Sequence, residues 1–273
     1  MCFYVASSYN IDTEILPWEI VENNVRNVQL GGRFTPKDCI SMWKVAIIIP
    51  YRDRENHLKV FLRNIHPFLQ QQKLEYGIFV IEMPPYADFN RGLLMNAGFK
   101  ESSELLNYNC FIFHDVDLLP EAVGNDYKCS DYPKHMASAV DTRNYTMPYE
   151  TYFGGVNAFS KEQFSLVNGF PNVYFGWGSE DDDLYHRVLN ANLTVQRLSH
   201  DIGRYRNLGH QRSVQGKGIE KLYNTKQQRY LSDGLNNLKY KRISYNFRPL
   251  CTWISIGLYN YTGQIMQEVQ NGE

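Results

Sequence analysis

The first half of the chain contains short, continuous apolar runs separated by longer amphipathic segments. Three such runs lie at residues 45–50, 78–81 and 110–113. Runs of this length and composition are typical of parallel strands that are buried on both faces of a sheet. Each run therefore predicts a central strand.

The segments between these runs predict helices. Residues 57–72 carry apolar side chains at helical spacing, and Pro67 should kink or end this helix early. Residues 89–106 predict a second helix. The order strand, helix, strand, helix, strand predicts a right-handed α/β fold with a mostly parallel sheet. In such sheets, ligands bind beyond the carboxyl ends of the strands.

The other segments have weaker patterns. Residues 1–43 are irregular and are interpreted as an arm packed on a main domain of residues 44–262. A helix is predicted over 180–192, with acidic residues in the first turn that favour the helix dipole. Residues 203–221 are rich in glycine and predict a mobile loop. Residues 263–273 predict a frayed tail.

Two acidic clusters are the most informative polar features. Asp115 and Asp117 follow the third predicted strand, and side chains two residues apart in an extended chain point the same way. Both carboxylates can therefore face one spot, and hard divalent cations prefer such oxygen ligands together with phosphate oxygens. The second cluster, residues 180–183, follows a Gly-Trp-Gly-Ser turn. Together the clusters indicate group transfer from a phosphate-activated donor.

Composition excludes some classes of function. The chain has 273 residues and 43% hydrophobic content, which is enough for a globular core. Its net charge of −1 gives no reason to expect a nucleic-acid partner or binding to an anionic membrane surface. No apolar run has the length of a membrane span, and the N-terminus lacks the features of a signal peptide. We therefore expect a protein that is soluble as encoded, or one whose N-terminal anchor is absent from this chain.

The cysteines and sequons bear on the compartment. Cys110 and Cys129 flank the Asp-Val-Asp segment at a spacing that suits a loop-closing disulfide, and two buried free thiols are an equal alternative. Asn144, Asn192 and Asn260 begin triplets of the N-glycosylation pattern, which arise often by chance and give weak support for a secretory route.

Seven motifs, in this order, resemble the β-1,4-galactosyltransferase family from about residue 30 to residue 258. The ordered set is far more specific than a single Asp-x-Asp. The motifs are KVAIIIPYRDR (44–54), FNR (89–91), DVD (115–117), YFGG (152–155), NGFP (168–171), GWGSEDDD (176–183) and LSDGLN (231–236).

This resemblance implies the GT-A type of fold, which is Rossmann-like and binds nucleotide sugars. It implies an inverting enzyme that moves galactose from UDP-galactose to the 4-hydroxyl of a terminal N-acetylglucosamine or glucose on a glycoprotein or glycolipid. Family members are type II membrane proteins of the Golgi lumen, so a Golgi or secreted location is expected. The resemblance also implies a Cys110–Cys129 disulfide and a second one at Cys39, with Cys2 as its candidate partner.

By the same resemblance, the donor site contains arginines for phosphate and carbonyl oxygens, and an aromatic ring for uracil. Tyr152 falls where a tyrosine disfavours the 2-acetamido group of N-acetylgalactosamine, so it predicts galactose as the donor sugar. Trp177 matches a tryptophan that moves over the donor, and Ser179 replaces a glycine, so a positive φ there would strain the turn. The expected donor residues are Pro50, Tyr51, Arg52, Arg54, Phe89, Arg91, Asp115, Val116, Tyr152 and Trp177.

The family's metal-ligand positions match this sequence with one change. Asp117 and His210 match two family ligands of a divalent cation, which is typically Mn²⁺. The third ligand is usually methionine, and this chain has Asn207 there. An amide oxygen is a harder donor than a thioether and would suit Mg²⁺ or Ca²⁺ better. The alternative is that Asn207 does not ligate and water takes the position.

The acceptor side matches in its acids but not in its apolar pocket. Asp181 matches the general base that takes the proton of the acceptor hydroxyl. Glu180 would line the galactose, and Asp182 would bind acceptor hydroxyls. The pocket for the acceptor N-acetyl group falls near Ile219 and Leu222, where this loop is shorter. An acidic helix start that only satisfies the helix dipole is compatible with these roles.

Two other functions remain open at this stage. One is transfer of N-acetylgalactosamine from its UDP-sugar on the same scaffold. The other is a catalytically silent protein that binds a glycan or a nucleotide, which Asn207, Ser179 and the altered acceptor pocket would explain. The presence of Asp117, His210 and Asp181 argues against a silent site.

Overall fold

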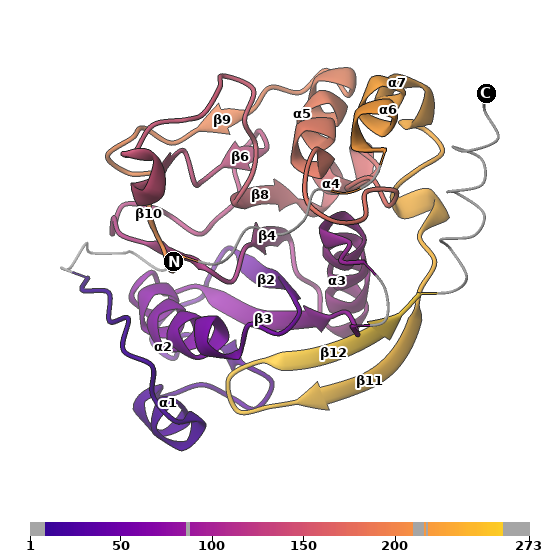
Figure 1. Ribbon diagram of the computed structural model, residues 1–273. Coiled ribbons are helices and arrows are strands. Elements are labelled where there is room, and N and C mark those ends of the chain that lie inside the picture. Colours follow the sequence, from indigo (N-terminus) through magenta and orange to yellow (C-terminus); the bar gives the residue numbers. More distant parts are fainter. Residues whose placement is uncertain (1–8, 86–87, 210–215, 217, 259–273) are drawn as a thin grey trace.

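The computed structural model describes residues 9–85, 88–209, 216 and 218–258. These residues build a nine-stranded sheet in the order β11-β12-β3-β2-β4-β8-β6-β9, with β1 beside β3 (Figure 1). Its four central strands run parallel to one another: β12 (Thr252–Gly257), β3 (Glu75–Glu82), β2 (Lys44–Tyr51) and β4 (Cys110–His114). The predicted α/β fold with a mostly parallel central sheet is therefore confirmed.

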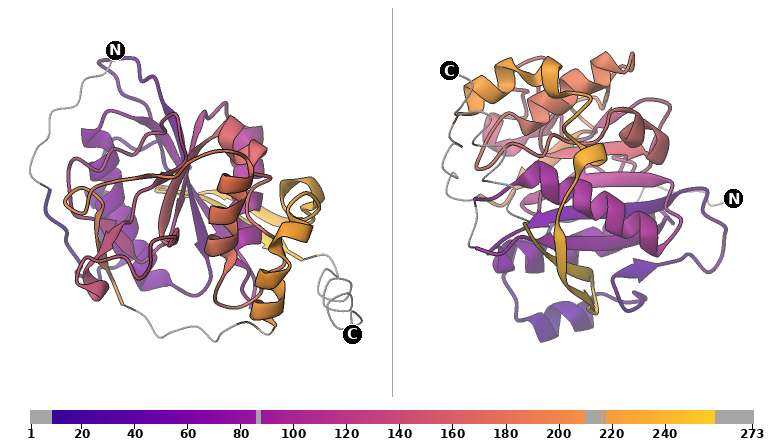
Figure 2. Two further views of the ribbon diagram at one scale, coloured as in Figure 1. Left: turned by 90° about the horizontal axis from the view of Figure 1, so that it is seen from above. Right: turned by 90° about the vertical axis from the view of Figure 1, so that its right-hand side faces the viewer.

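Two helices cover opposite faces of this sheet because apolar side chains of the central strands alternate in direction. Ile47 of β2 belongs to the apolar cluster formed with α2 (Glu55–Gln71), whereas the next residue, Ile48, belongs to the cluster formed with α3 (Arg91–Leu105). Successive side chains of a strand point to opposite faces. Seen from above, α2 lies on one side of the sheet, and α3 lies on the other together with α5 (Glu180–Asn190) (Figure 2).

Shorter strands extend the sheet at its margins. On the β4 side, β8 (Val156–Ser160) and β6 (Lys134–His135) pair antiparallel, and β9 (Gln196–Arg197) follows in parallel. On the other side, β11 (Lys241–Phe247) pairs antiparallel with β12, and β1 (Arg33–Phe34) pairs with β3. The remaining helices are α1 (Trp18–Asn24), η1 (Asp141–Arg143), α4 (Lys161–Leu166), α6 (Ile219–Asn224), α7 (Lys226–Arg229) and η2 (Leu235–Asn237).

A second, three-stranded sheet stands beside the carboxyl end of β4. It places β10 (Arg204–Asn207) between β5 (Leu118–Pro120) and β7 (Ala139–Val140). The prediction of a mobile loop over residues 203–221 is therefore wrong for β10 and for α6. Tyr205 is fully buried between flanking arginines, and pairing on both sides of β10 outweighs the nearby glycines.

Of the two effects expected of Pro67, a kink or an early end of the helix, the early end is wrong, because α2 continues to Gln71. Phe68 and Leu69, which follow the proline, are buried in the core, so tertiary packing offsets the lost backbone hydrogen bond. In the same turn, the backbone carbonyl of Asn64 accepts a hydrogen bond of 2.8 Å from the Tyr9 hydroxyl.

The described part of the N-terminal segment, residues 9–43, contains α1 and β1 and packs on the main core. Val21 of α1 is buried in the same apolar cluster as α2, and Tyr9 and Trp18 pack against that cluster. The predicted tail, residues 263–273, lies outside the described residues. Within the described part of the chain, no helix combines the length and apolarity needed to cross a bilayer.

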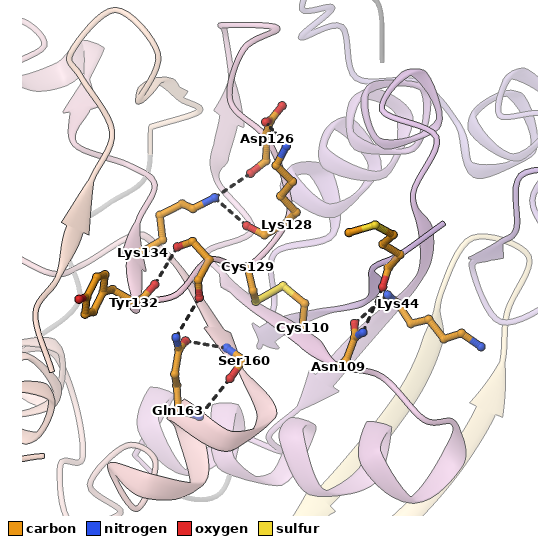
Figure 3. The surroundings of a disulfide bond; sticks show 12 residues. Lys44, Asn109, Cys110, Asp126, Lys128, Cys129, Tyr132, Lys134, Ser160 and Gln163 are labelled. Carbon is orange, nitrogen blue, oxygen red and sulfur yellow. Dashed lines mark hydrogen bonds and ion pairs between the residues drawn. A yellow bond between two sulfur atoms is a disulfide. The ribbon is translucent and has the colours of Figure 1, made fainter. Parts of the chain in front are cut away.

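A disulfide joins the start of β4 to the loop that follows β5 (Figure 3). Cys110 and Cys129 are bonded with Cα atoms 5.5 Å apart, so the disulfide alternative is confirmed. The loop is further held by Gln163 of α4, whose amide nitrogen donates to the Ser130 carbonyl at 2.9 Å (Figure 3). Cys39 is also disulfide-bonded, and its expected partner Cys2 lies outside the described residues. Cys251 is free and buried.

We expect the double variant Cys110→Ala/Cys129→Ala to lower the free energy of unfolding by about 2–4 kcal/mol, because the unfolded chain loses a cross-link over a sequence separation of 19 residues. Urea denaturation of the full chain measures this change. Cys251→Ala is the matched control, since it removes a buried sulfur without opening a loop. A double variant no less stable than this control would contradict the prediction.

Candidate active site

The expected donor residues gather at the edge of the sheet where the parallel strands β2 and β4 end. Pro50 and Tyr51 are the last buried residues of β2, and Val116 is buried just beyond β4. The next residue after β2, Arg52, places its guanidinium carbon 5.1 Å from the centroid of the Phe89 ring. The structure thus brings together two motifs that are far apart in the sequence, through a cation–π contact.

Arg54 and Trp177 lie at the ends of neighbouring segments. Arg54 is the N-cap residue of α2. The turn that carries Trp177 is joined to the Phe89 segment by a backbone hydrogen bond from Gly176 to the Phe89 carbonyl, at 2.8 Å. The Trp177 side chain is 63% exposed, which is unusual for tryptophan in a folded domain. Its indole is therefore free of the core, as a side chain that moves over a ligand must be.

Arg91 connects the two acidic clusters. Its Nε lies 2.7 Å from Asp115 at the end of β4, and its Nη1 lies 3.5 Å from Glu180 at the start of α5. Arg91 begins α3, so one guanidinium joins three elements. Nη1 is buried and makes no hydrogen bond to the described residues, although it faces the Glu180 carboxylate. Such an unsatisfied donor is suited to an incoming oxygen of a ligand.

Asp117 leads directly into β5 and is 9% exposed. Its backbone carbonyl accepts a hydrogen bond from Leu208 at 2.8 Å, which ties the acidic motif to the end of β10. Asn207 is the last residue of β10 and lies opposite Leu118, next to Asp117. Its side-chain oxygen accepts the backbone N–H of Gly209 at 2.7 Å. The contact with Gly209 occupies one lone pair of the Asn207 oxygen.

The fit to a divalent cation rests on oxygen chemistry. The Asp117 carboxylate is a hard donor of the kind that Mn²⁺, Mg²⁺ and Ca²⁺ accept. The expected histidine ligand, His210, lies outside the described residues. Within residues 9–85, 88–209, 216 and 218–258, no group of three or more His, Cys, Asp or Glu side chains is placed to hold a metal. The described residues therefore contribute Asp117, with Asn207 beside it.

The turn before α5 is strained at one position. Ser179 has φ +71°, in the left-handed region, and two glycines of the same turn also have positive φ: Gly176 at +84° and Gly178 at +117°. A non-glycine residue in this region costs about 1–2 kcal/mol. The expectation that serine strains this turn is therefore confirmed, and the strain lies beside Glu180, the first residue of α5.

Asp181 and Asp182 at the start of α5 lie against the segment of residues 149–154. The Tyr149 hydroxyl donates to Asp182 Oδ1 at 2.9 Å. A methyl group on Gly154 would collide with both Asp181 Oδ2 and the hydroxyl of Tyr152, so these two oxygens lie over the same glycine. Gly154 is thus required to be glycine for a steric reason, and it allows Tyr152 and Asp181 to approach each other.

Crowding raises the pKa of the acids in this cluster. Burial, together with the neighbouring carboxylates of Glu180 and Asp182, raises the pKa of Asp181 from 3.8 to about 8, although Arg91 opposes the change. Burial also raises the pKa of Glu180. A carboxyl group whose pKa lies near the working pH is suited to proton transfer.

Ile219 and Leu222 have a packing role in the structure. Both are buried at the start of α6, in a small cluster with Val173 and Tyr174. The Ile219 side chain reaches the Gly178 turn, where a Cβ on the glycine would lie 3.6 Å from Ile219 Cδ1. The Ile219 side chain therefore supports the turn that carries Trp177.

Two residues at the site have no signal in the sequence pattern. Tyr149 contacts Asp182, as described above, and Arg143 donates a hydrogen bond to the Tyr152 hydroxyl at 3.0 Å. Neither residue belongs to a motif with periodic spacing or to a charge cluster. Only the fold brings them to the acids of α5.

Comparison with known proteins assigns the class. Residues 4–130 match the family model for the N-terminal region of glycosyl transferase group 7, and residues 134–211 match the model for the N-terminal domain of galactosyltransferase. The catalytic domain of Drosophila β-1,4-galactosyltransferase 7, solved in complex with xylobiose, superposes with a TM-score of 0.71 at 30% identity, covering 81% of this chain and 98% of that one. The fold is thus of the GT-A galactosyltransferase type.

Whole-sequence relatives narrow the class further. β-1,4-Galactosyltransferase 2 of Cricetulus griseus is 42% identical over 90% of this chain and 68% of its own length. β-1,4-Galactosyltransferase 1 of Bos taurus is 44% identical over 92% of this chain, which spans 62% of the bovine protein. The chain belongs to the β-1,4-galactosyltransferase family.

The raised pKa of Asp181 predicts a pH-dependent gain of stability in Asp181→Asn. The folded protein holds this proton up to about pH 8, whereas an unfolded aspartate releases it near 3.8. The folded state therefore binds more protons between these values, and the carboxyl lowers stability as pH rises through this window. We expect the variant to melt several degrees above the wild type at pH 8 and at nearly the same temperature at pH 4. Asp131→Asn, at an exposed aspartate, is the control. If Asp181→Asn and the wild type melted at the same temperature at pH 8, the raised pKa of Asp181 would be contradicted.

Proposed function

We propose that this protein transfers galactose from UDP-galactose, with inversion, to the 4-hydroxyl of a terminal N-acetylglucosamine or glucose on a glycoprotein or glycolipid. The observation that carries the proposal is the meeting of Arg91, Asp115, Glu180 and Asp181 beyond the carboxyl ends of β2 and β4. In α/β sheets this is where ligands bind. A relative supports the choice of ligands: a mutant of Drosophila β-1,4-galactosyltransferase 7 was solved with manganese, UDP-Gal and xylobiose, with a TM-score of 0.70 at 28% identity.

The nucleotide would lie against the end of β2. Phe89, held beneath the Arg52 guanidinium, would stack on uracil, and Arg52 and Arg54 would bind phosphate and carbonyl oxygens. Asp115, fixed by Arg91, would accept hydrogen bonds from the ribose. The unsatisfied Nη1 of Arg91 would bind an oxygen of the donor. Trp177 would move over the bound donor.

Asp117 would hold the divalent cation, with His210 and, in the alternative that it ligates, Asn207. The cation, Mn²⁺ or else Mg²⁺ or Ca²⁺, would neutralise the charge that develops on the leaving diphosphate. The Asp117 backbone, which carries the carboxylate, is held by a hydrogen bond from Leu208, directly after β10. This arrangement limits the reorganisation needed during reaction.

Asp181 would act as the base on the acceptor. The oxygen of the acceptor 4-hydroxyl attacks C1 of galactose, the bond from C1 to the diphosphate oxygen breaks, and UDP leaves with that electron pair. The acceptor proton passes to the Asp181 carboxylate. The raised pKa makes Asp181 a stronger base, and the fraction in the basic form grows as pH rises toward about 8. Asp182, held by Tyr149, would bind acceptor hydroxyls.

A lumenal or secreted location accords with this role. The Cys110–Cys129 disulfide is of a kind that persists in oxidising compartments. The proposed location is the Golgi lumen, with a type II membrane anchor outside this chain, or the extracellular space. The disulfide distinguishes these compartments from a reducing one and does not choose between them.

A second candidate is a protein that binds a nucleotide sugar or a glycan without turnover. Two observations favour it over transfer: Ser179 occupies a left-handed position, and the Asn207 amide oxygen is engaged by Gly209. Transfer of N-acetylgalactosamine is the other candidate. The tyrosine at position 152, beside Gly154, favours galactose as the donor sugar instead. Release of UDP in the presence of Mn²⁺, with each donor and with N-acetylglucosamine or glucose as acceptor, separates all three.

Asp117→Ala is expected to reduce UDP release on the order of 10³-fold, because several kcal/mol of charge stabilisation on the leaving group is lost. The fold should be retained, since the hydrogen bond from Leu208 uses the backbone carbonyl that alanine keeps. Calorimetry should show weaker UDP binding in Mn²⁺. The matched control is Asp131→Ala, an exposed aspartate in the loop after Cys129, which should behave as wild type. If Asp117→Ala turned over at the wild-type rate, Asp117 would not be a ligand of the cation.

Tyr152→Leu is expected to gain transfer from UDP-N-acetylgalactosamine while keeping most galactose transfer, because the smaller side chain leaves room for the acetamido group. The ratio of kcat/KM for the two donors measures this change. Tyr152→Phe is the control that keeps the ring and removes only the hydroxyl. A wild-type protein that prefers UDP-N-acetylgalactosamine would falsify the role given to Tyr152.

A further inference from the structure

Arg143 makes a two-part contact with the side chain that selects the donor sugar. It is the last residue of η1, and its guanidinium carbon lies 4.5 Å from the centroid of the Tyr152 ring. Its Nη2 also donates a hydrogen bond to the Tyr152 hydroxyl at 3.0 Å. Among the described residues, no carboxylate lies within ion-pair distance of Arg143. The contacts described here for the Arg143 guanidinium are therefore both with Tyr152.

The turn that carries Arg143 is itself fixed. Asp141 Oδ1 accepts the backbone N–H of Asn207 at 2.9 Å, and the Arg204 guanidinium carbon lies 3.5 Å from the centroid of the Tyr145 ring. The Arg143 carbonyl accepts the hydroxyl of Thr146 at 2.8 Å. Contacts on both sides of η1 thus hold it against β10. A shift of the η1 backbone away from Tyr152 would break these contacts.

Hydrogen-bond chemistry then sets the direction of the Tyr152 proton. A guanidinium group donates and cannot accept, so the Tyr152 oxygen is the acceptor in this pair. The phenol proton must point elsewhere, and among the described residues no oxygen accepts it. The Tyr152 oxygen and Asp181 Oδ2 lie over the same face of Gly154, so this free donor is presented beside the proposed base.

We propose that Arg143 is a positioning residue that sets donor-sugar selectivity by holding the ring and hydroxyl of Tyr152 in place. This inference rests on the proposed galactosyl transfer. The galactose 2-hydroxyl would accept the phenol proton, and a 2-acetamido group would need the ring to move. Stacking and the hydrogen bond both oppose that movement. A site that offers a directed hydrogen bond to a substrate hydroxyl discriminates strongly against analogues that do not fit it.

The test compares donors across Arg143 variants. Arg143→Met keeps the length of the side chain and removes the charge and the hydrogen bond. We expect it to lower the ratio of kcat/KM for UDP-galactose over UDP-N-acetylgalactosamine about tenfold, which corresponds to ~1.4 kcal/mol. Arg143→Lys keeps the cation and should recover part of the ratio. Arg206→Met, an exposed arginine of β10, is the matched control and should leave the ratio unchanged.

A double-mutant cycle shows whether Arg143 acts through the Tyr152 hydroxyl. In a Tyr152→Phe background, adding Arg143→Met should change the donor ratio less than it does in the wild type, because the hydrogen bond is already gone and only the stacking on the ring remains. Equal loss of both donors in Arg143→Met, with an unchanged ratio, would show a merely structural role and overturn this inference alone. Additive effects in the cycle would also overturn it. A wild-type chain that transfers neither sugar would overturn the proposed function, and this inference with it.

Discussion

The site depends on one buried cation between two acidic segments. Arg91 contacts Asp115 at the end of β4 and Glu180 at the start of α5, and its side chain is only 12% exposed. Burying a guanidinium is costly unless carboxylates surround it, and each carboxylate needs the cation for the same reason. The pairing therefore joins the start of α5 to the end of β4. Leu184 and Val188 of α5 pack into the apolar layer on the same face of the sheet and support this position.

The burial and crowding of these acids change their pKa values and also lower the stability of the fold. Burial raises the pKa values of Asp181 and Glu180, and the neighbouring carboxylates raise them further, although Arg91 opposes both changes. The turn before them adds backbone strain at Ser179. Strain and charge repulsion at one place are typical of a functional site that the rest of the fold stabilises. The large apolar layers on both faces of the sheet supply that stability.

The sequence predicts the centre of the fold well because the relevant signals are local. Strands β2, β3 and β4 are apolar runs, and the acids that follow β4 and precede α5 stand out by residue type alone. Strands β6 and β9 have two residues each and owe their existence to distant partners, so no local pattern reveals them. The same holds for β10, where pairing outweighs glycine content. Contacts such as Arg143 to Tyr152 join residues with no shared motif, and only tertiary structure produces them.

The Cys110–Cys129 bond has a consequence for handling the protein. The covalent ring that it closes contains the whole Asp-Val-Asp segment, residues 115–117. A thiol reductant in a purification buffer that reduced this bond would open the ring around Asp115 and Asp117. Protein made in a reducing cytoplasm would then differ from protein made in an oxidising compartment in the covalent structure around residues 115–117. If protein from a reducing host is inactive, the state of this disulfide has to be checked before any conclusion about the substrate is drawn.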